Sequence, residues 1–126
     1  MPNYERWTES MMRSWASLEG AATARLFTRD VEYYETPNGV PCGSWEDVER
    51  LWEPVPTNQK NITYSFEVVM SGDRFGLINW KMERDLLAPA GWAHQSIDGI
   101  FLVSVTEDNL CNYFKQWRHV EARPLA

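Results

Sequence analysis

Residues 94–120 read HQSIDGIFLVSVTEDNLCNYFKQWRHV. This stretch predicts two β-strands, 94–105 and 110–120, because β-branched and aromatic side chains dominate both segments and the polar residues between them favour a turn. A tight turn about residues 107–108 would join the strands as an antiparallel hairpin. The hairpin therefore provides a geometric frame for placing the other residues.

In that frame Asp98 lies opposite Trp117, and side chains alternate between two faces. One face carries His94, Ser96, Asp98, Ile100, Cys111, Tyr113, Lys115, Trp117 and His119. The other carries Ile97, Phe101, Val103, Val105, Leu110, Asn112, Phe114, Gln116 and Arg118. Because both faces are partly apolar, each needs a cover, and we expect a homodimer through the face that helices leave uncovered.

The segments before the hairpin predict helices followed by strands. Apolar residues recur at helical spacing over 4–16, a short helix fits 18–27, and Ser44 is a suitable N-cap for a helix over 45–52. Alternating patterns predict strands over 61–70 and 75–83. This order predicts an α+β fold with an antiparallel sheet, in one domain spanning residues 1–126.

Composition excludes several classes of function. The 126 residues carry 18 acidic and 12 basic side chains, a net charge of -6, so nucleic acid and membrane surfaces are not expected partners. The start of the chain resembles no secretion signal and no apolar run approaches a membrane span, so we expect a cytoplasmic protein. Cys42 and Cys111 are expected to be free thiols, and with only two His and no compact ligand spacing, no metal site is expected.

Four segments together resemble a known family. They are LFTRDVEYY at 26–34, TPNGVPCG at 36–43, DGIF at 98–101 and FKQW at 114–117. Their order is similar to that in the SnoaL-like branch of the nuclear transport factor two-like superfamily. The resemblance implies a cone-shaped α+β barrel, in which a strongly curved antiparallel sheet wraps around N-terminal helices and leaves an apolar cavity. It also implies that the face holding Asp98 and Trp117 looks into that cavity.

The superfamily includes ketosteroid isomerase, polyketide cyclases, scytalone dehydratase, limonene epoxide hydrolase and binding domains without chemistry. The resemblance therefore implies a cofactor-independent isomerase or lyase that moves protons on a small apolar or cyclic molecule. The alternative is a non-catalytic module for ligand binding or protein assembly. In ketosteroid isomerase the general base is a carboxylate at the corner before the Pro-Gly segment. Here Glu35 or Thr36 takes that position, depending on whether the alignment follows Asp30 or Pro37.

Asp98 is the expected acid/base, because desolvation in an apolar cavity would raise the pKa of its carboxyl group toward the range useful for proton transfer. His94 and Tyr34 are its expected partners, as proton shuttle and hydrogen-bond donor. Each has an ordinary structural alternative. Asp98 would form an ion pair with Lys115, His94 would lie solvated at the cavity mouth, and Tyr34 would be a core aromatic residue.

A larger set of side chains is expected to line the cavity and bind the substrate, with ordinary core packing as the alternative for each. The set consists of Trp52, Tyr64, Phe66, Ile78, Trp80, Met82, Ile100, Tyr113, Lys115 and Trp117.

Overall fold

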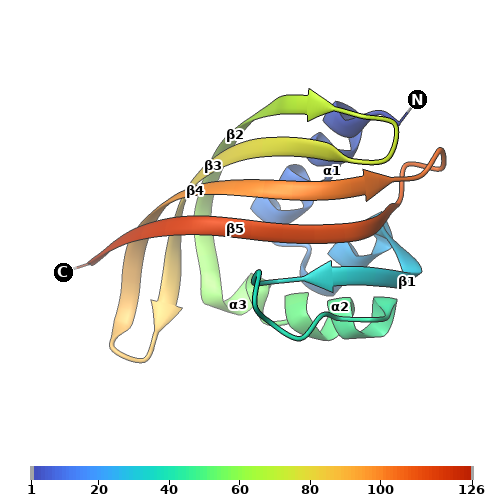
Figure 1. Ribbon diagram of the computed structural model, residues 1–126. Coiled ribbons are helices and arrows are strands. Elements are labelled where there is room, and N and C mark those ends of the chain that lie inside the picture. The colour runs from blue at the N-terminus through green and yellow to red at the C-terminus, as the bar shows by residue number, and fades with distance from the viewer. Residues whose placement is uncertain (1, 126) are drawn as a thin grey trace.

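The computed structural model describes residues 2–125, with helices packed on one side of a curved sheet (Figure 1). The helical elements are α1 (Tyr4–Ala16), the 3₁₀ helix η1 (Gly20–Leu26), α2 (Trp45–Trp52) and α3 (Val55–Asn58). The strands are β1 (Phe27–Tyr34), β2 (Gln59–Ser71), β3 (Gly76–Ala88), β4 (Gly91–Val105) and β5 (Cys111–Pro124). None of the helices in this part of the chain is long and apolar enough to cross a membrane.

The five strands form one open sheet in the order β1-β5-β4-β3-β2. Strands β2 to β5 are antiparallel neighbours, whereas β1 pairs with the last strand, β5, in parallel. The expected α+β cone fold is confirmed, but the sheet is mixed and not wholly antiparallel. The difference arises because a loop and two helices, not a hairpin, follow β1, so its direction is not set by a neighbouring strand.

Local signals in the sequence account for the helices. The Asn3 side chain caps α1 by accepting a hydrogen bond from Arg6 N, and Ser44 caps α2 by accepting one from Asp47 N. The predicted helix over 18–27 is a 3₁₀ turn, and Gly20 within it has a φ of 64°. A side chain at Gly20 would also collide with Pro56, so the close approach of η1 and α3 requires glycine.

The β4–β5 turn is longer than predicted. Asn109 has a φ of 64°, and Thr106 N donates to Leu110 O at 2.8 Å, which closes the turn around residues 107–109. Asp98 consequently pairs with His119, not with Trp117. Because this shift is two residues, residues 113–119 keep the faces that the sequence assigned to them. Cys111 is an exception, since a bulge after Ser104 pairs it with Val105 and it is fully buried on the inner face.

The orientation of the two faces is the reverse of the expectation. Phe101, Val103 and Phe114 are completely buried against the helices, whereas Asp98 is exposed and Trp117 is 40% exposed on the outer face. The expectation that Asp98 and Trp117 look into the cavity is therefore wrong. The physical reason is that the face of Phe101 buries much more apolar area than the face that carries charged and hydroxyl side chains.

The space between α1 and the sheet is filled by large side chains. Trp7, Met11 and Met12 of α1 are fully buried, as are Trp80 and Phe101 of the sheet, whose rings stack at 5.0 Å. Close packing there leaves no room for a ligand under the middle of α1. Cys42 and Cys111 are free thiols, as predicted.

Candidate functional site

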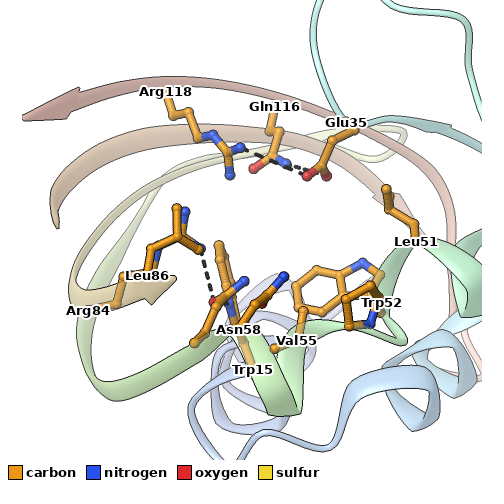
Figure 2. Close-up of a pocket in the computed structure, with 12 residues that line it drawn as sticks. Trp15, Glu35, Leu51, Trp52, Val55, Asn58, Arg84, Leu86, Gln116 and Arg118 are labelled. Atoms are coloured by element: carbon orange, nitrogen blue, oxygen red, sulfur yellow. Dashed lines mark hydrogen bonds and ion pairs between the residues drawn. The ribbon is translucent and has the colours of Figure 1, made fainter. Parts of the chain in front are cut away.

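A pocket of about 220 Å³ lies at the end of the sheet beyond this packed core, where α2, α3 and the C-terminal end of α1 face the strands (Figure 2). Its volume equals that of about seven waters in the liquid, which suits a ligand of roughly one ring. The pocket is lined by Trp15, Glu35, Leu51, Trp52, Pro54, Val55, Asn58, Gln59, Arg84, Leu86, Gln116 and Arg118.

Glu35 occupies the corner directly after β1 and enters the pocket as a carboxylate fixed at one oxygen. Tyr33 Oη donates to Glu35 Oε1 at 2.8 Å, and Gln116 Nε2 donates to the same oxygen at 2.7 Å. Within residues 2–125, Glu35 Oε2 makes no hydrogen bond, and Arg118 Nη2 lies 4.0 Å from it. Glu35 thus has one oxygen that sets its orientation and one that is open to a ligand.

Tyr33 and Trp52 support this carboxylate from the core. Tyr33 is fully buried, and Trp52 Nε1 donates to its hydroxyl oxygen at 3.1 Å. Burial, as the larger cause, and the charge of Glu35, as the smaller, raise the pKa of Tyr33 well above 10. Its hydroxyl therefore stays protonated and remains a donor to Glu35. The Trp52 ring meets the Trp15 ring edge to face, with centroids 5.1 Å apart, and the two rings form an apolar wall.

Arg84 enters the pocket from β3 with its side chain held by neutral groups. Its Nε donates to Gln95 Oε1 and its Nη1 to Gln59 Oε1, both at 2.9 Å, and its guanidinium lies 5.7 Å from the Trp15 ring centroid. Arg84 is only 4% exposed. Burial, as the larger cause, and the nearby charge of Arg118, as the smaller, lower the pKa of Arg84 to about 10. The guanidinium therefore remains charged at neutral pH.

The lining also contains unused hydrogen-bond acceptors. Gln116 Oε1 and Asn58 Oδ1 are buried and have no partner among the described residues. Buried acceptors of this kind are rare in folded proteins and are commonly satisfied by water or ligand. The described part of the chain contains no cluster of three or more His, Cys, Asp and Glu residues that could hold a metal ion.

The three residues expected to be catalytic lie outside this pocket. Asp98 is on the outer face, where Asn79 Nδ2 donates to it at 2.7 Å, and it forms no ion pair with Lys115. The register explains this, because Lys115 pairs with Leu102, four positions from Asp98. An exposed carboxylate lacks the desolvation on which the proposed role of Asp98 depended.

His94 and Tyr34 are likewise on the outer side of the sheet. The His94 ring contacts Glu83 Oε1 at 2.8 Å and Asp85 Oδ1 at 3.0 Å, and it does not hydrogen-bond to Asp98. Tyr34 Oη donates to Glu32 at 2.6 Å, in an exposed pair. The structure therefore does not bring the three expected catalytic side chains together.

Of the side chains expected to bind the substrate, Trp52 lines the pocket. Five others point inward but are occupied by packing or by α1: Ile78, Trp80 and Met82 are buried, Phe66 packs against the core, and Tyr64 Oη donates to Glu9 Oε1 at 2.9 Å. The remaining four lie on the outer face and cannot line the pocket: Ile100, Tyr113, Lys115 and Trp117.

Glu35 was one of two alternatives at the corner after β1, and the structure places it in the pocket while Thr36 is exposed. Arg84, Gln59 and Arg118 were not singled out from the sequence. A signal for Arg84 was present, because the inward series of Ile78, Trp80 and Met82 continues to residue 84 when β3 is extended by one more pleat.

A scan of protein-family models gives no match to this sequence, and a search of curated proteins gives none either. Solved structures do match. The epoxide hydrolase/cyclase-like enzyme SalBIII, which has a role in pyran ring formation in the polyether salinomycin, superposes with a TM-score of 0.76 at 10% identity, over 91% of this chain and 89% of SalBIII. A Catenulispora acidiphila protein with a ketosteroid isomerase-like fold, solved with trimethylamine, gives 0.72 at 12% identity, over 93% and 86% of the two chains.

A Mycobacterium tuberculosis protein in complex with estradiol-17beta-hemisuccinate gives a TM-score of 0.68 at 14% identity, over 88% of this chain and 89% of that one. The chain therefore has the same α+β cone fold as these proteins, and the fold that the sequence resemblance implied is confirmed. Isomerase-like and cyclase-like proteins, and proteins that bind small hydrophobic molecules, share this architecture.

Proposed function

We propose that this protein is an enzyme that transfers a proton on a small cyclic or partly apolar molecule without a cofactor, with Glu35 as the acid/base. The observation that carries the proposal is the arrangement of Glu35, whose Oε1 receives two hydrogen bonds while Oε2 has none from the described residues. Such a carboxylate is held in one orientation and retains an oxygen that can accept a proton.

The chemistry follows from the groups around Oε2. A substrate with a carbonyl group would give the proton of its neighbouring carbon to Glu35 Oε2, and the electron pair of the broken C–H bond would form an enolate. Arg118, 4.0 Å from Oε2, supplies positive charge where the enolate oxygen develops negative charge. Return of the proton at another carbon gives isomerisation. Departure of a hydroxyl group from the neighbouring carbon, with the proton from Glu35 completing a water molecule, gives dehydration. Attack of the enolate carbon on a second carbonyl, whose oxygen then takes the proton, gives ring closure.

The pocket walls support a cyclic substrate. Trp15 and Trp52 present ring surfaces, and Val55 and Leu86 add aliphatic contacts around the same space. A volume of about 220 Å³ accepts a single ring more readily than a steroid. The similar fold of an epoxide hydrolase/cyclase-like enzyme supports a catalytic role for this architecture.

The second candidate is a non-catalytic binding or assembly module. The observation that favours it is the occurrence of the same fold in a computationally designed 17-OHP binder, at a TM-score of 0.68 and 14% identity. The two candidates differ in one measurable respect, because only the enzyme exchanges carbon-bound protons of its ligand.

Deuterium exchange tests the proposal. Small cyclic ketones and their carboxylated derivatives are incubated with the protein in D₂O, and loss of the proton signal beside the carbonyl is followed by NMR. We expect Glu35→Gln to slow the exchange by roughly 100-fold or more, since general acid–base catalysis contributes on that order. Asp98→Asn is the matched control and should leave the rate unchanged. Equal exchange by Glu35→Gln and the unmodified protein would contradict the proposal, and binding without exchange would favour the second candidate.

We further propose that two copies associate through the outer face of β4 and β5. Ile100 and Trp117 are cross-strand neighbours there, with Trp117 40% exposed, and large exposed apolar side chains on a sheet face favour association. We likewise propose the cytoplasmic location and the single domain that the sequence leads us to expect.

A further inference from the structure

Arg84 presents a buried positive charge without a negative partner. Among residues 2–125 no carboxylate forms an ion pair with it, and its side-chain partners are the amide oxygens of Gln59 and Gln95 and the ring of Trp15. Buried charges in proteins are normally paired, because removing a charge from water is costly. Two neutral oxygens offset only part of that cost.

The guanidinium also has N–H groups that make no hydrogen bond with the described residues. Arg84 has five N–H groups, of which one on Nε and one on Nη1 are used, and Nη2 makes no hydrogen bond with the described residues. A planar guanidinium edge with free donors matches the two oxygens of a carboxylate. Arg84 therefore has the geometry, as well as the charge, of an anion-binding group.

The other charged groups in the pocket do not cancel this charge. Arg118 and Glu35 both line it and lie near each other, at 4.0 Å, so their charges largely offset one another. Figure 2 shows Arg118, Gln116 and Glu35 along one side of the open space and Arg84 with Leu86 on another. The lining of two arginines and one glutamate thus leaves one positive charge, located on Arg84.

We infer that the substrate is a small cyclic or aromatic carboxylic acid, bound as its anion with the carboxylate on Arg84 and the ring against Trp15 and Trp52. This inference rests on the proposed function and names the substrate class for the same site. The carboxylate would supply the negative partner that Arg84 lacks, and the ring would occupy the remaining apolar volume. The carboxylate then fixes the position of the reacting carbon relative to Glu35.

Benzoate and its neutral isostere benzamide test the inference. Both have one ring and nearly the same shape, so a difference in their affinities reports the charge. Binding is measured by calorimetry and by quenching of tryptophan fluorescence at neutral pH. We expect benzoate to bind at least about tenfold more tightly than benzamide, in keeping with the greater strength of charge-assisted hydrogen bonds.

Variants assign this preference to Arg84. Arg84→Gln should abolish it, and Arg84→Lys, which keeps the charge but not the planar fork, should retain part of it. Lys81→Gln is the matched control, because it removes one positive charge from the outward side of the same strand and should leave the preference intact. Near-ultraviolet circular dichroism of each variant establishes that the fold is kept.

Equal binding of the two probes, failure of benzoate to bind at millimolar concentration, or an undiminished preference in Arg84→Gln would overturn the inference. Glu35→Gln separates this result from the proposed function. That variant should bind benzoate as well as or better than the unmodified protein, because a carboxylate near the ligand is removed, while losing proton exchange. A failure confined to exchange would therefore count against the function and not against the carboxylate site.

Discussion

The side-chain amide of Gln116 on β5 donates a 2.7 Å hydrogen bond to Oε1 of Glu35, directly after β1, and so connects two residues that are 81 apart in the sequence. This bond fixes the carboxylate that we propose as the acid/base. We expect Gln116→Leu to destabilise the fold by about 1–3 kcal/mol, because a hydrogen bond to a charged group is lost in a partly buried place. It should also slow proton exchange, with the larger effect on kcat and the smaller on KM.

The chain offers a matched control for this prediction. Asn79 Nδ2 donates to Asp98 at 2.7 Å, an amide–carboxylate bond of the same length on the exposed side of the sheet. Asn79→Leu should destabilise the fold less, because exposed polar contacts contribute little, and should leave exchange unchanged. Equal effects of the two substitutions on kcat would contradict a positioning role for Gln116.

Gly99 on β4 allows Trp80 to lie flat across the sheet. A Cβ at Gly99 would overlap the ring of Trp80, which is fully buried. Gly99→Ala is expected to reduce the free energy of unfolding by about 1–3 kcal/mol or more, in the range of other overpacked cores. Gly43→Ala, where nothing lies within 4 Å, should change it by less than about 0.5 kcal/mol. Urea denaturation of both variants measures the difference, and equal stabilities would contradict the packing described for Trp80.

His94 makes stability depend on pH in a defined direction. Hydrogen bonds from its ring to Glu83 and then Asp85 raise the pKa of His94 above its ordinary value of 6.5. A group whose pKa is higher in the folded state stabilises the fold below its unfolded pKa, and this contribution is lost as pH rises through the folded pKa. The His94 contact lowers the pKa of Glu83, and a hydrogen bond from Asn61, together with the smaller effect of His94, lowers the pKa of Asp85, so the carboxylates lose their contribution only at acid pH.

His94→Gln therefore should cost more stability near pH 5.5 than near pH 8.5, a window about the ordinary histidine pKa. Urea denaturation of the variant and the unmodified protein at the two pH values gives the comparison. A larger cost at the alkaline value would show that the two carboxylates do not stabilise the protonated ring.

The proposed dimer makes a prediction about mass in solution. Light scattering should give twice the chain mass of 14.7 kDa for the unmodified protein and the chain mass for Trp117→Glu, which places a charge in the outer face. Val40→Glu alters a loop side chain that is 96% exposed and should remain dimeric. A monomer at high protein concentration would contradict the proposal.

Local features of the fold were predictable from the sequence. The bounds of α1 and α2 follow from apolar spacing and from the capping side chains of Asn3 and Ser44, and these signals act over a few residues. The faces of residues 113–119 also followed from alternation and survived an error of two residues in the register, whereas the bulge that turns Cys111 inward had no local signal. The parallel pairing of β1 with β5 depends on contacts far apart in the chain and had no local signal.

The candidate site was harder to predict, because it depended on which face of the hairpin turns inward. The resemblance to the family placed Asp98 inside, whereas the greater apolar area around Phe101 and Phe114 favoured the opposite face. Once that orientation is known, Gln116 can be assigned to the inner face by alternation from Phe114, and Glu35 can be assigned to the pocket from its position at the corner after β1. Predicting Arg84 as a pocket residue required the full length of β3, which continues beyond the predicted end at residue 83.

The central claim is that ligands enter the pocket beside Glu35 and do not bind on the outer face of the sheet. Indole N–H signals in ¹⁵N NMR report the place of binding directly, since Trp15 and Trp52 line the pocket and Trp117 lies outside it. Addition of the cyclic ketone that exchanges fastest in D₂O should move the signals of Trp15 and Trp52 and leave that of Trp117 in place. Movement of the Trp117 signal with no change at Trp15 or Trp52 would contradict the account.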